Sequence, residues 1–288
     1  MMPWVESLDR PTTIPEALRL VRRGGRQARF VAGATDLLVQ ADRSVRYLVD
    51  VTRLRLDYIK RQRGGWAIGA TTTMATLEHS RVIQRLANGV LALAASTCGS
   101  VQNRNLATLG GNLANASPAG DTAVPLLVLD AEVVMAGPKG RRRLPLSQFF
   151  RGVRKTALNG ALLVEIFIPK LLRAPVAWSF QKLGRVESDI SVVNAAVSLA
   201  LDKQGRCIWV RIAMGAVAPA PVRMVQAEKL LEGKRLDRAV VEEASEQVSK
   251  DVSPITDVRA SESYRREMSR VLVRRALVEC AGRLGVKL

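Results

Sequence analysis

Two glycine-containing segments of similar chemistry, both predicted to be long loops, constrain this chain more than any other feature of its sequence. Residues 31–38 read Val-Ala-Gly-Ala-Thr-Asp-Leu-Leu, and residues 108–112 read Thr-Leu-Gly-Gly-Asn. Glycine lets the backbone approach an anion closely, so successive amides can converge on phosphate oxygens while threonine and asparagine side chains add donors. Neither segment contains Lys or Arg, so backbone dipoles and helix N-termini would neutralise a phosphate there. The alternative is that each segment is a tight turn between packed elements.

Other kinds of site find little support in the sequence. The two segments match neither the Gly-x-Gly-x-x-Gly pattern of dinucleotide folds nor the P-loop pattern. His79 is the only histidine and no Gly-x-Ser-x-Gly motif accompanies it, so we expect a surface or helix-capping role for it. Cys98, Cys207 and Cys280 are too widely spaced for a Cys-x-x-Cys element, and three thiols are too few for an iron–sulfur cluster. We therefore expect no catalytic residue and no metal ligand on this chain, with any redox metal on another chain.

The basic charge of the chain first suggests nucleic acid. Its 44 Lys and Arg residues against 26 Asp and Glu give a net charge of +18. The excess is spread along the sequence, however, and residues 64–128 carry only three arginines against Glu78 and Asp121. No nucleic-acid-binding motif accompanies it, and with 4% aromatic residues the chain has few stacking platforms. We therefore expect no nucleic-acid partner.

The sequence also indicates where the protein resides. No apolar run approaches the roughly 20 residues of a membrane span. The first residues lack the basic and apolar regions of a secretory signal, which favours a cytoplasmic location.

Hydrophobic periodicity and turn residues predict two domains. In the first, we expect a helix over 15–22, strands over 29–32, 47–51, 66–70, 131–136 and 162–169, and two helices over 77–95 separated at Asn88-Gly89. The Pro-containing, basic stretch 169–175 is the predicted linker. In the second, we expect strands over 176–183, 191–201 and 207–217 before helices, the last over about 262–284. This order predicts domains over 1–172 and 176–288, the second a small α+β domain with helices on an antiparallel sheet.

The second glycine segment strongly resembles the Thr-Ile-Gly-Gly-Asn signature of the FAD-binding subunit of molybdenum hydroxylases. The first resembles the Ala-Gly-Gly-Thr-Asp-Leu-Leu of the same family, which includes xanthine dehydrogenase and aerobic carbon monoxide dehydrogenase. Further similarity lies in residues 180–185, at Asp189-Ile190 and in residues 215–221. The resemblance therefore runs along the whole chain.

This resemblance implies an α+β protein with a vanillyl-alcohol-oxidase-type (PCMH) FAD-binding domain of two α/β subdomains and a smaller C-terminal α+β domain. It also implies that FAD binds on this chain. The residues implied to line the FAD pyrophosphate are Arg29, Phe30, Val31, Ala32, Gly33, Ala34, Thr35, Asp36, Thr108, Leu109, Gly110, Gly111 and Asn112.

Three isolated positions also match cofactor-binding positions of the family. Asp121 matches a position near the adenosine, Leu162 an apolar position against the adenine or ribose, and Lys182 a basic position near the isoalloxazine. Each has an alternative role. Asp121 would cap the following helix, Leu162 would belong to the core, and Lys182 would be a solvated charge at a strand end.

The sequence departs from the family pattern at three places. Ala34 stands where a second glycine is usual, and its methyl group would strain a left-handed backbone by about 1 kcal/mol. Asn103 replaces an aliphatic residue, and Ala161 replaces an acidic residue before the strand at 162–169.

The function implied by the resemblance is electron transfer within a molybdenum hydroxylase. Electrons from a molybdopterin-binding large subunit would pass through the 2Fe-2S clusters of a small subunit to FAD on this chain, and then to NAD, a quinone or oxygen. The +18 charge would dock acidic partner subunits. Two alternatives stay open: a free-standing FAD-dependent oxidase or reductase of the same fold, and a flavin-free assembly or nucleic-acid-binding protein.

Overall fold

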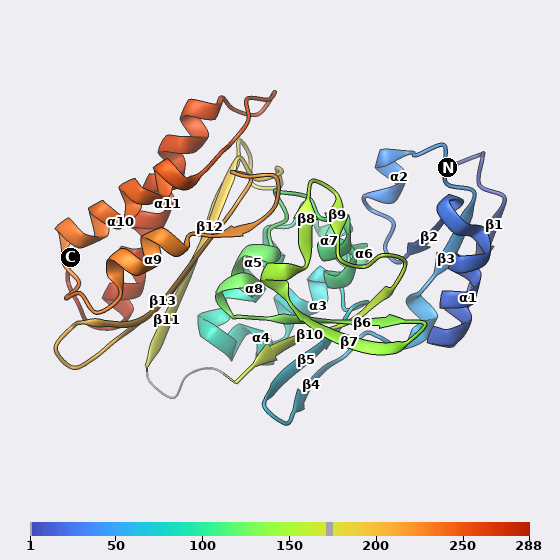
Figure 1. Cartoon of the computed structure of the whole chain (residues 1–288), viewed down its shortest axis with the longest axis horizontal. Helices are drawn as coiled ribbons and strands as arrows, with labels where there is room; N and C mark the ends of the chain where they lie inside the picture. The colour runs from blue at the N-terminus through green and yellow to red at the C-terminus, as the bar shows by residue number, and fades with distance from the viewer. Residues whose placement is uncertain (1, 171–174) are drawn as a thin grey trace.

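The computed structural model describes residues 2–170 and 175–288, and it shows three consecutive parts along the long axis of the molecule (Figure 1). The predicted linker over 169–175 and the predicted boundary at 172 fall largely on residues 171–174, which lie outside the described residues. In the described ranges, no helix combines the length and hydropathy that crossing a membrane requires.

The N-terminal part is a small parallel sheet in the order β1-β3-β2, with helices beside it. Its elements are β1 (Ser7–Asp9), α1 (Ile14–Gly24), β2 (Ala28–Val31), α2 (Leu37–Gln40) and β3 (Tyr47–Asp50). Helix α1 begins where the Thr13 side chain accepts a hydrogen bond from the Glu16 amide, and it ends at Gly25, whose φ is +54°. The helix predicted over 15–22 is confirmed, and Pro15 lies in its first turn.

The central part is an antiparallel sheet in the order β4-β5-β10-β6-β7, with a group of short helices against it. Its strands are β4 (Ile59–Gln62), β5 (Gly65–Gly69), β6 (Glu132–Gly137), β7 (Gly140–Pro145) and β10 (Leu162–Pro169), and the pair β8 (Phe150–Gly152) and β9 (Lys155–Thr156) forms a separate hairpin. Its helices are α3 (Met74–His79), α4 (Arg81–Arg85), α5 (Val90–Ser96), α6 (Val101–Leu106), α7 (Leu109–Asn115) and α8 (Ala123–Val128).

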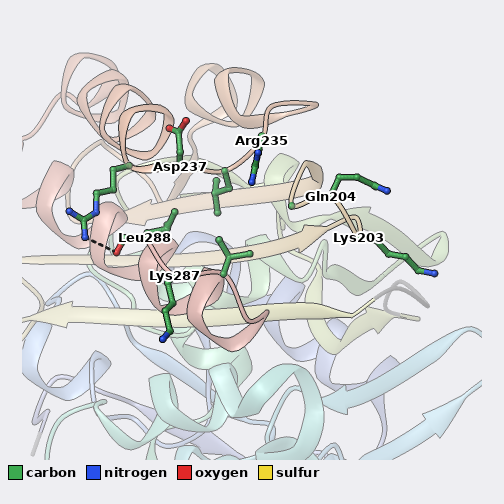
Figure 2. Close-up of a pocket in the computed structure, with 10 residues that line it drawn as sticks. Lys203, Gln204, Arg235, Asp237, Lys287 and Leu288 are labelled. Carbon is green, nitrogen blue, oxygen red and sulfur yellow. Dashed lines mark hydrogen bonds between the residues drawn. The ribbon is translucent and has the colours of Figure 1, made fainter.

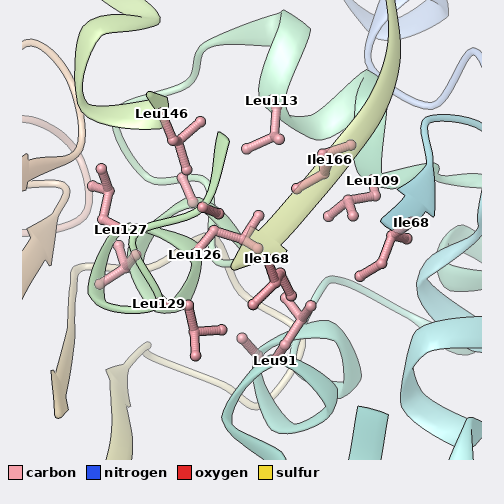
Figure 3. Packing of buried hydrophobic residues seen from close by; sticks show 14 of the residues in the cluster. Ile68, Leu91, Leu109, Leu113, Leu126, Leu127, Leu129, Leu146, Ile166 and Ile168 are labelled. Carbon is pink, nitrogen blue, oxygen red and sulfur yellow. The ribbon is translucent and has the colours of Figure 1, made fainter. Parts of the chain in front are cut away.

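Strand β10 is covered on both faces, which explains its nearly continuous apolar sequence. Leu162 and Val164 pack with residues of the N-terminal part, whereas Ile166 and Ile168 enter the main core with the helices. A register shift between Leu163 and Glu165 interrupts the alternation of side chains, so Leu162 and Val164 point to one face of the sheet and Ile166 and Ile168 to the other. Figure 3 shows the main core around Ile166 and Ile168, into which helices α5, α7 and α8 direct leucines.

The C-terminal part is the predicted antiparallel sheet with helices. Its elements are β11 (Val176–Leu183), β12 (Val193–Leu201), β13 (Cys207–Gly215), β14 (Val222–Arg223), α9 (Val225–Leu231), α10 (Arg238–Asp251) and α11 (Glu262–Arg283). Helices α9 and α11 pack on this sheet, and α8 of the central part also contacts β12 and β13 (Figure 1). The three long strands and the terminal helix agree with the sequence prediction.

Two local predictions are wrong. The region 77–95 was expected to hold two helices, but Ser80 ends α3 and its side chain caps α4, so an additional break precedes the one at Asn88-Gly89. The second glycine segment was expected to be a long loop, but residues 109–115 form helix α7. The physical reason is that Leu109 and Leu113, one helical turn apart, are both fully buried (Figure 3).

Candidate cofactor site

The two glycine segments meet across a cavity of about 360 Å³ between the N-terminal and central parts. Close packing holds them together, because a Cβ built on Gly33 would lie only 1.8 Å from the carbonyl oxygen of Leu106. Gln40 of α2 also donates a hydrogen bond of 2.9 Å to Asn115 of α7. The predicted residues that line this cavity are Arg29, Phe30, Val31, Ala32, Gly33, Ala34, Thr35, Asp36, Thr108, Gly111 and Asn112. Leu109 and Gly110 do not line it.

The first segment presents its backbone to the cavity. Within the described chain, the amides of residues 33–36 donate no hydrogen bond to a backbone or side-chain acceptor. Ala34 has a φ of +58°, which is the left-handed backbone conformation that strains an alanine. Successive amides around a left-handed residue form a concave anion-binding surface. The methyl group at residue 34 therefore carries a strain that glycine would avoid.

The second segment uses its amides inside the protein. The amide of Leu109 donates to the Thr72 carbonyl (2.9 Å) and that of Gly110 to the Ala70 carbonyl (2.8 Å). The Gly111 amide donates to Thr108 Oγ1 at 3.1 Å, the helix cap of α7. The amides of Leu109, Gly110 and Gly111 therefore already have acceptors, in the residues that follow β5 and in the helix cap. Contact of this segment's backbone with a phosphate stays a prediction.

Asn112 gives the second segment a donor of a different kind. Its Oδ1 accepts a hydrogen bond of 2.6 Å from Thr122 Oγ1, which fixes the orientation of the side-chain amide. The Nδ2 group makes no hydrogen bond within the described residues, and Asn112 lines the cavity. The free Nδ2 donor of Asn112 therefore lies in the wall of the same cavity as the amides of the first segment.

Arg154 is a cavity residue that the sequence reasoning missed. It lies in the hairpin of β8 and β9, and its amide donates to the Ala116 carbonyl at 3.1 Å, just after α7. Its guanidinium makes no ion pair or hydrogen bond with a described residue, whereas that of Arg29 donates to the carbonyls of Arg26 and Ala28. Arg154 belongs to no motif shared with the glycine segments. The fold of the hairpin places its positive charge at the cavity.

A smaller cavity of about 90 Å³ adjoins the first and shares Phe30, Ala32, Thr108 and Gly111 with it. Its wall includes Leu162, which is 4% exposed and also belongs to the core. Both roles considered for Leu162 are therefore compatible with its position. Ala161 also lines this cavity, while Asn103 is exposed on α6.

Asp121 and Lys182 lie together at the junction with the C-terminal part, and neither lines the two cavities. Lys182 Nζ is 2.8 Å from Asp121 Oδ2, and Asp121 Oδ1 also accepts from Ser191 (2.5 Å) and Asn194 (2.8 Å). The side chains of the pair are only 8% and 7% exposed, so Lys182 is not a solvated charge. Asp121 does not cap α8 either, because α8 has no side-chain cap. Contact of these two residues with FAD stays a prediction.

The cysteines and the histidine offer no alternative site. Burial, with the nearby Asp121 carboxylate, raises the pKa of the Cys98 thiol to about 12, and burial raises the pKa of Cys207 to about 12. His79 is exposed at the last position of α3. No group of metal-ligating side chains occurs among the described residues.

A second, wider hollow of about 650 Å³ lies in the C-terminal part, far from the glycine segments in sequence (Figure 2). Basic side chains surround it, among them Lys203, Arg235 and Lys287. It contains none of the predicted cofactor residues. The cavity between the glycine segments is therefore the candidate site.

Comparison with known proteins identifies the family of this chain. Residues 6–171 match the model of the FAD-binding domain in molybdopterin dehydrogenase, and residues 178–280 match that of the carbon monoxide dehydrogenase flavoprotein C-terminal domain. This chain belongs to the molybdopterin dehydrogenase FAD-binding family. The first match ends at residue 171, the first of the undescribed residues 171–174, and the second begins after them.

Members of this family resemble the chain over nearly its full length. It is 32% identical to the xanthine dehydrogenase FAD-binding subunit of Escherichia coli O157:H7, covering 98% of both chains. It is 31% identical to the glyceraldehyde dehydrogenase medium chain of Sulfolobus acidocaldarius, covering 98% of this chain and 100% of the relative. A structure of carbon monoxide dehydrogenase from Hydrogenophaga pseudoflava superposes with a TM-score of 0.93 at 31% identity, covering 98% and 99% of the two chains. These relatives confirm the predicted fold class, an FAD-binding domain of two subdomains followed by a C-terminal α+β domain.

Proposed function

We propose that this chain holds the FAD pyrophosphate in the cavity between its glycine segments and serves as the electron-transfer subunit of a molybdenum hydroxylase. The observation that carries the proposal is the convergence of three kinds of donor on one cavity. The first segment supplies free amides at residues 33–36, Asn112 supplies an oriented side-chain amide, and Arg154 supplies a positive charge. An anion with several oxygens fits such a set, and the adjoining apolar cavity suits an organic group attached to it.

When bound, FAD would supply the redox chemistry, and the protein residues would bind and orient it. The amides of the first segment and Arg154 would neutralise the pyrophosphate. Asn112 would fix its position relative to α7, while Leu162 would contact the apolar part of the cofactor. The chain itself would need no acid, base or metal ligand for this role.

The partners in this proposal are a molybdopterin-binding large subunit and a small subunit with 2Fe-2S clusters, in a heterotrimer or its dimer. The naming of one relative as a medium chain supports a multi-subunit assembly. The basic surface of this chain supports acidic partners, because Arg141, Arg142 and Arg143 lie exposed on the edge strand β7. NAD, a quinone or oxygen would accept the electrons. A cytoplasmic location stays a prediction that cell fractionation would test.

The visible spectrum of the purified full-length chain tests the cofactor assignment directly. We expect a yellow protein, or a colourless one that becomes yellow and quenches flavin fluorescence when FAD is added. A folded chain that binds no FAD would overturn the proposal.

Co-purification tests the partner assignment. We expect this chain to bring down iron–sulfur and molybdopterin subunits, and the complex to weaken as the salt concentration rises. A yellow chain that turns over substrate alone would instead favour the free-standing oxidase, and an assembly insensitive to salt would argue against acidic partners.

A further inference from the structure

Three consecutive threonines follow strand β5, and two of them have clear structural roles. Thr72 Oγ1 donates to the Tyr58 carbonyl at 3.2 Å. Thr73 Oγ1 accepts from the Thr76 amide at 3.1 Å and so caps α3. Thr71 is also buried, with 7% of its surface exposed, but its Oγ1 has no hydrogen-bond partner in the described chain.

The backbone holds Thr71 firmly beside the candidate site. Its own amide donates to the Leu56 carbonyl at 2.9 Å, and the carbonyl of the preceding Ala70 accepts from Gly110 at 2.8 Å. A Cβ built on Gly110 would lie 2.6 Å from that of Ala70, so β5 and α7 are in close contact here. Thr71 lines the smaller cavity, whose other wall residues include Val51 and Leu162.

An unpaired buried hydroxyl lowers stability, and valine has nearly the same shape without that penalty. The neighbouring threonines show that hydroxyls in this run are otherwise satisfied. A ligand in the cavity that Thr71 lines would give its Oγ1 a hydrogen-bond partner, and this cavity adjoins the proposed pyrophosphate site and shares wall residues with it. We propose that Thr71 is a cofactor-positioning residue whose Oγ1 hydrogen-bonds a polar atom of FAD next to the pyrophosphate. This inference rests on the proposed function.

The test compares FAD affinity with the stability of the FAD-free chain. For Thr71→Val in the full-length protein, we expect FAD affinity, measured by quenching of flavin fluorescence, to fall about tenfold. The melting temperature of the FAD-free variant should equal or exceed that of the wild type, because an unpaired hydroxyl has been removed. A purely structural threonine would give the opposite result, with a lower melting temperature and unchanged affinity.

Two further variants keep the test decisive. Thr71→Ser retains the hydroxyl and should restore most of the affinity, even if the valine variant folds poorly. Thr72→Val should lower the melting temperature, because it removes the bond to Tyr58, and leave FAD affinity close to the wild-type value. If wild-type protein binds FAD and Thr71→Val binds it equally well, the role of Thr71 is wrong while the proposed function stands. If the wild type binds no FAD, the proposed function itself fails.

Discussion

The two glycine segments have similar sequences, but the structure uses them in different ways. In the first, the amides of residues 33–36 stay free and face a cavity around the left-handed Ala34. In the second, the amides of residues 109–111 bond to the residues that follow β5 or to the helix cap, and the side-chain amide of Asn112 keeps a free donor. In the proposed site, the first segment would therefore offer its backbone to the pyrophosphate, and the second would offer a side chain on a rigid helix.

The difference arises from what lies behind each segment. Helix α7 buries Leu109 and Leu113 in the main core, so its backbone is fixed as a helix from Leu109 onward. Helix α2 is only four residues long, and Leu38 and Val39 on it are 52% and 84% exposed. Only Val31 of this segment is buried, with Ala34 and Leu37 partly packed against the same small cluster. A segment anchored so weakly keeps its amides out of regular structure, which suits a binding loop.

The largest expected effect comes from separating the two segments. Gly33→Ala places a Cβ against the Leu106 carbonyl, which can yield only if the backbone moves. We expect the free energy of unfolding to fall by about 2–3 kcal/mol, as in other overpacked sites, and FAD binding to weaken strongly. Urea denaturation and a flavin titration measure both effects.

The control for that variant is Gly282→Ala in α11, where an added Cβ meets nothing within 4 Å. It should stabilise the protein by about 0.5–1 kcal/mol through helix propensity. Equal losses in the two variants would show that the contact between Gly33 and Leu106 does not matter.

The next effect tests whether the second segment acts through a side chain. Asn112→Asp keeps an oxygen to accept from Thr122 but replaces the Nδ2 donor with a negative oxygen. We expect FAD affinity to fall tenfold or more, about 1.4 kcal/mol, with little change in the melting temperature of the FAD-free protein. Asn105→Asp, exposed at the end of α6, adds the same charge away from the cavity wall and should leave affinity nearly unchanged. Similar losses in both variants would indicate a general charge effect.

A smaller effect is expected at Arg154, which would compensate for the missing cations of both segments. Arg154→Gln should weaken FAD binding by about threefold to tenfold at low salt and by less at high salt, because the side chain is exposed. The matched variant is Arg151→Gln in the same hairpin, which does not line the cavity. Isothermal titration at two salt concentrations makes the comparison. A salt-independent loss, or one shared by Arg151→Gln, would contradict the role of Arg154.

The smallest effect concerns the strain at residue 34. Ala34→Gly should raise the free energy of unfolding by about 0.5 kcal/mol, since relief at φ +58° slightly exceeds the added chain entropy of glycine. Ala34→Val should lower it, because a β-branched side chain is disfavoured there. Chemical denaturation of the three proteins, with wild type as reference, tests the order. A glycine variant less stable than the wild type would show that the left-handed backbone costs this alanine little.

The fold could be predicted from the sequence wherever the hydrophobic pattern of a segment matches the way that segment packs in the structure. Residues 162–169 form a strand because a continuous apolar run bounded by Pro169 fits a strand buried on both faces. Helix α11 was predicted from apolar residues at helical spacing, of which Leu272 and Ala276 lie on its buried face. The break at Ser80 was not predicted, because its serine cap is too short a signal within an apolar stretch.

The site was only partly accessible. The sequence identified the residues of both segments, and most of them line one cavity. It did not predict which of their backbone amides would be hydrogen-bonded within the protein, because a Gly-Gly pair is compatible with either outcome. Arg154 and Thr71 were missed because neither belongs to a motif. Asp121 and Lys182, distant in sequence, proved to be hydrogen-bonded to each other at the domain junction.

The sequence by itself determined the family, the order of elements and the two segments that line the candidate site. These properties depend on local periodicity and on short motifs, which each segment carries independently of its neighbours. Only the tertiary structure decided which amides stay free, which cation reaches the cavity and which threonine lacks a partner. Whether a polar group is buried and hydrogen-bonded depends on which residues the fold packs against it, and those residues are usually distant in sequence.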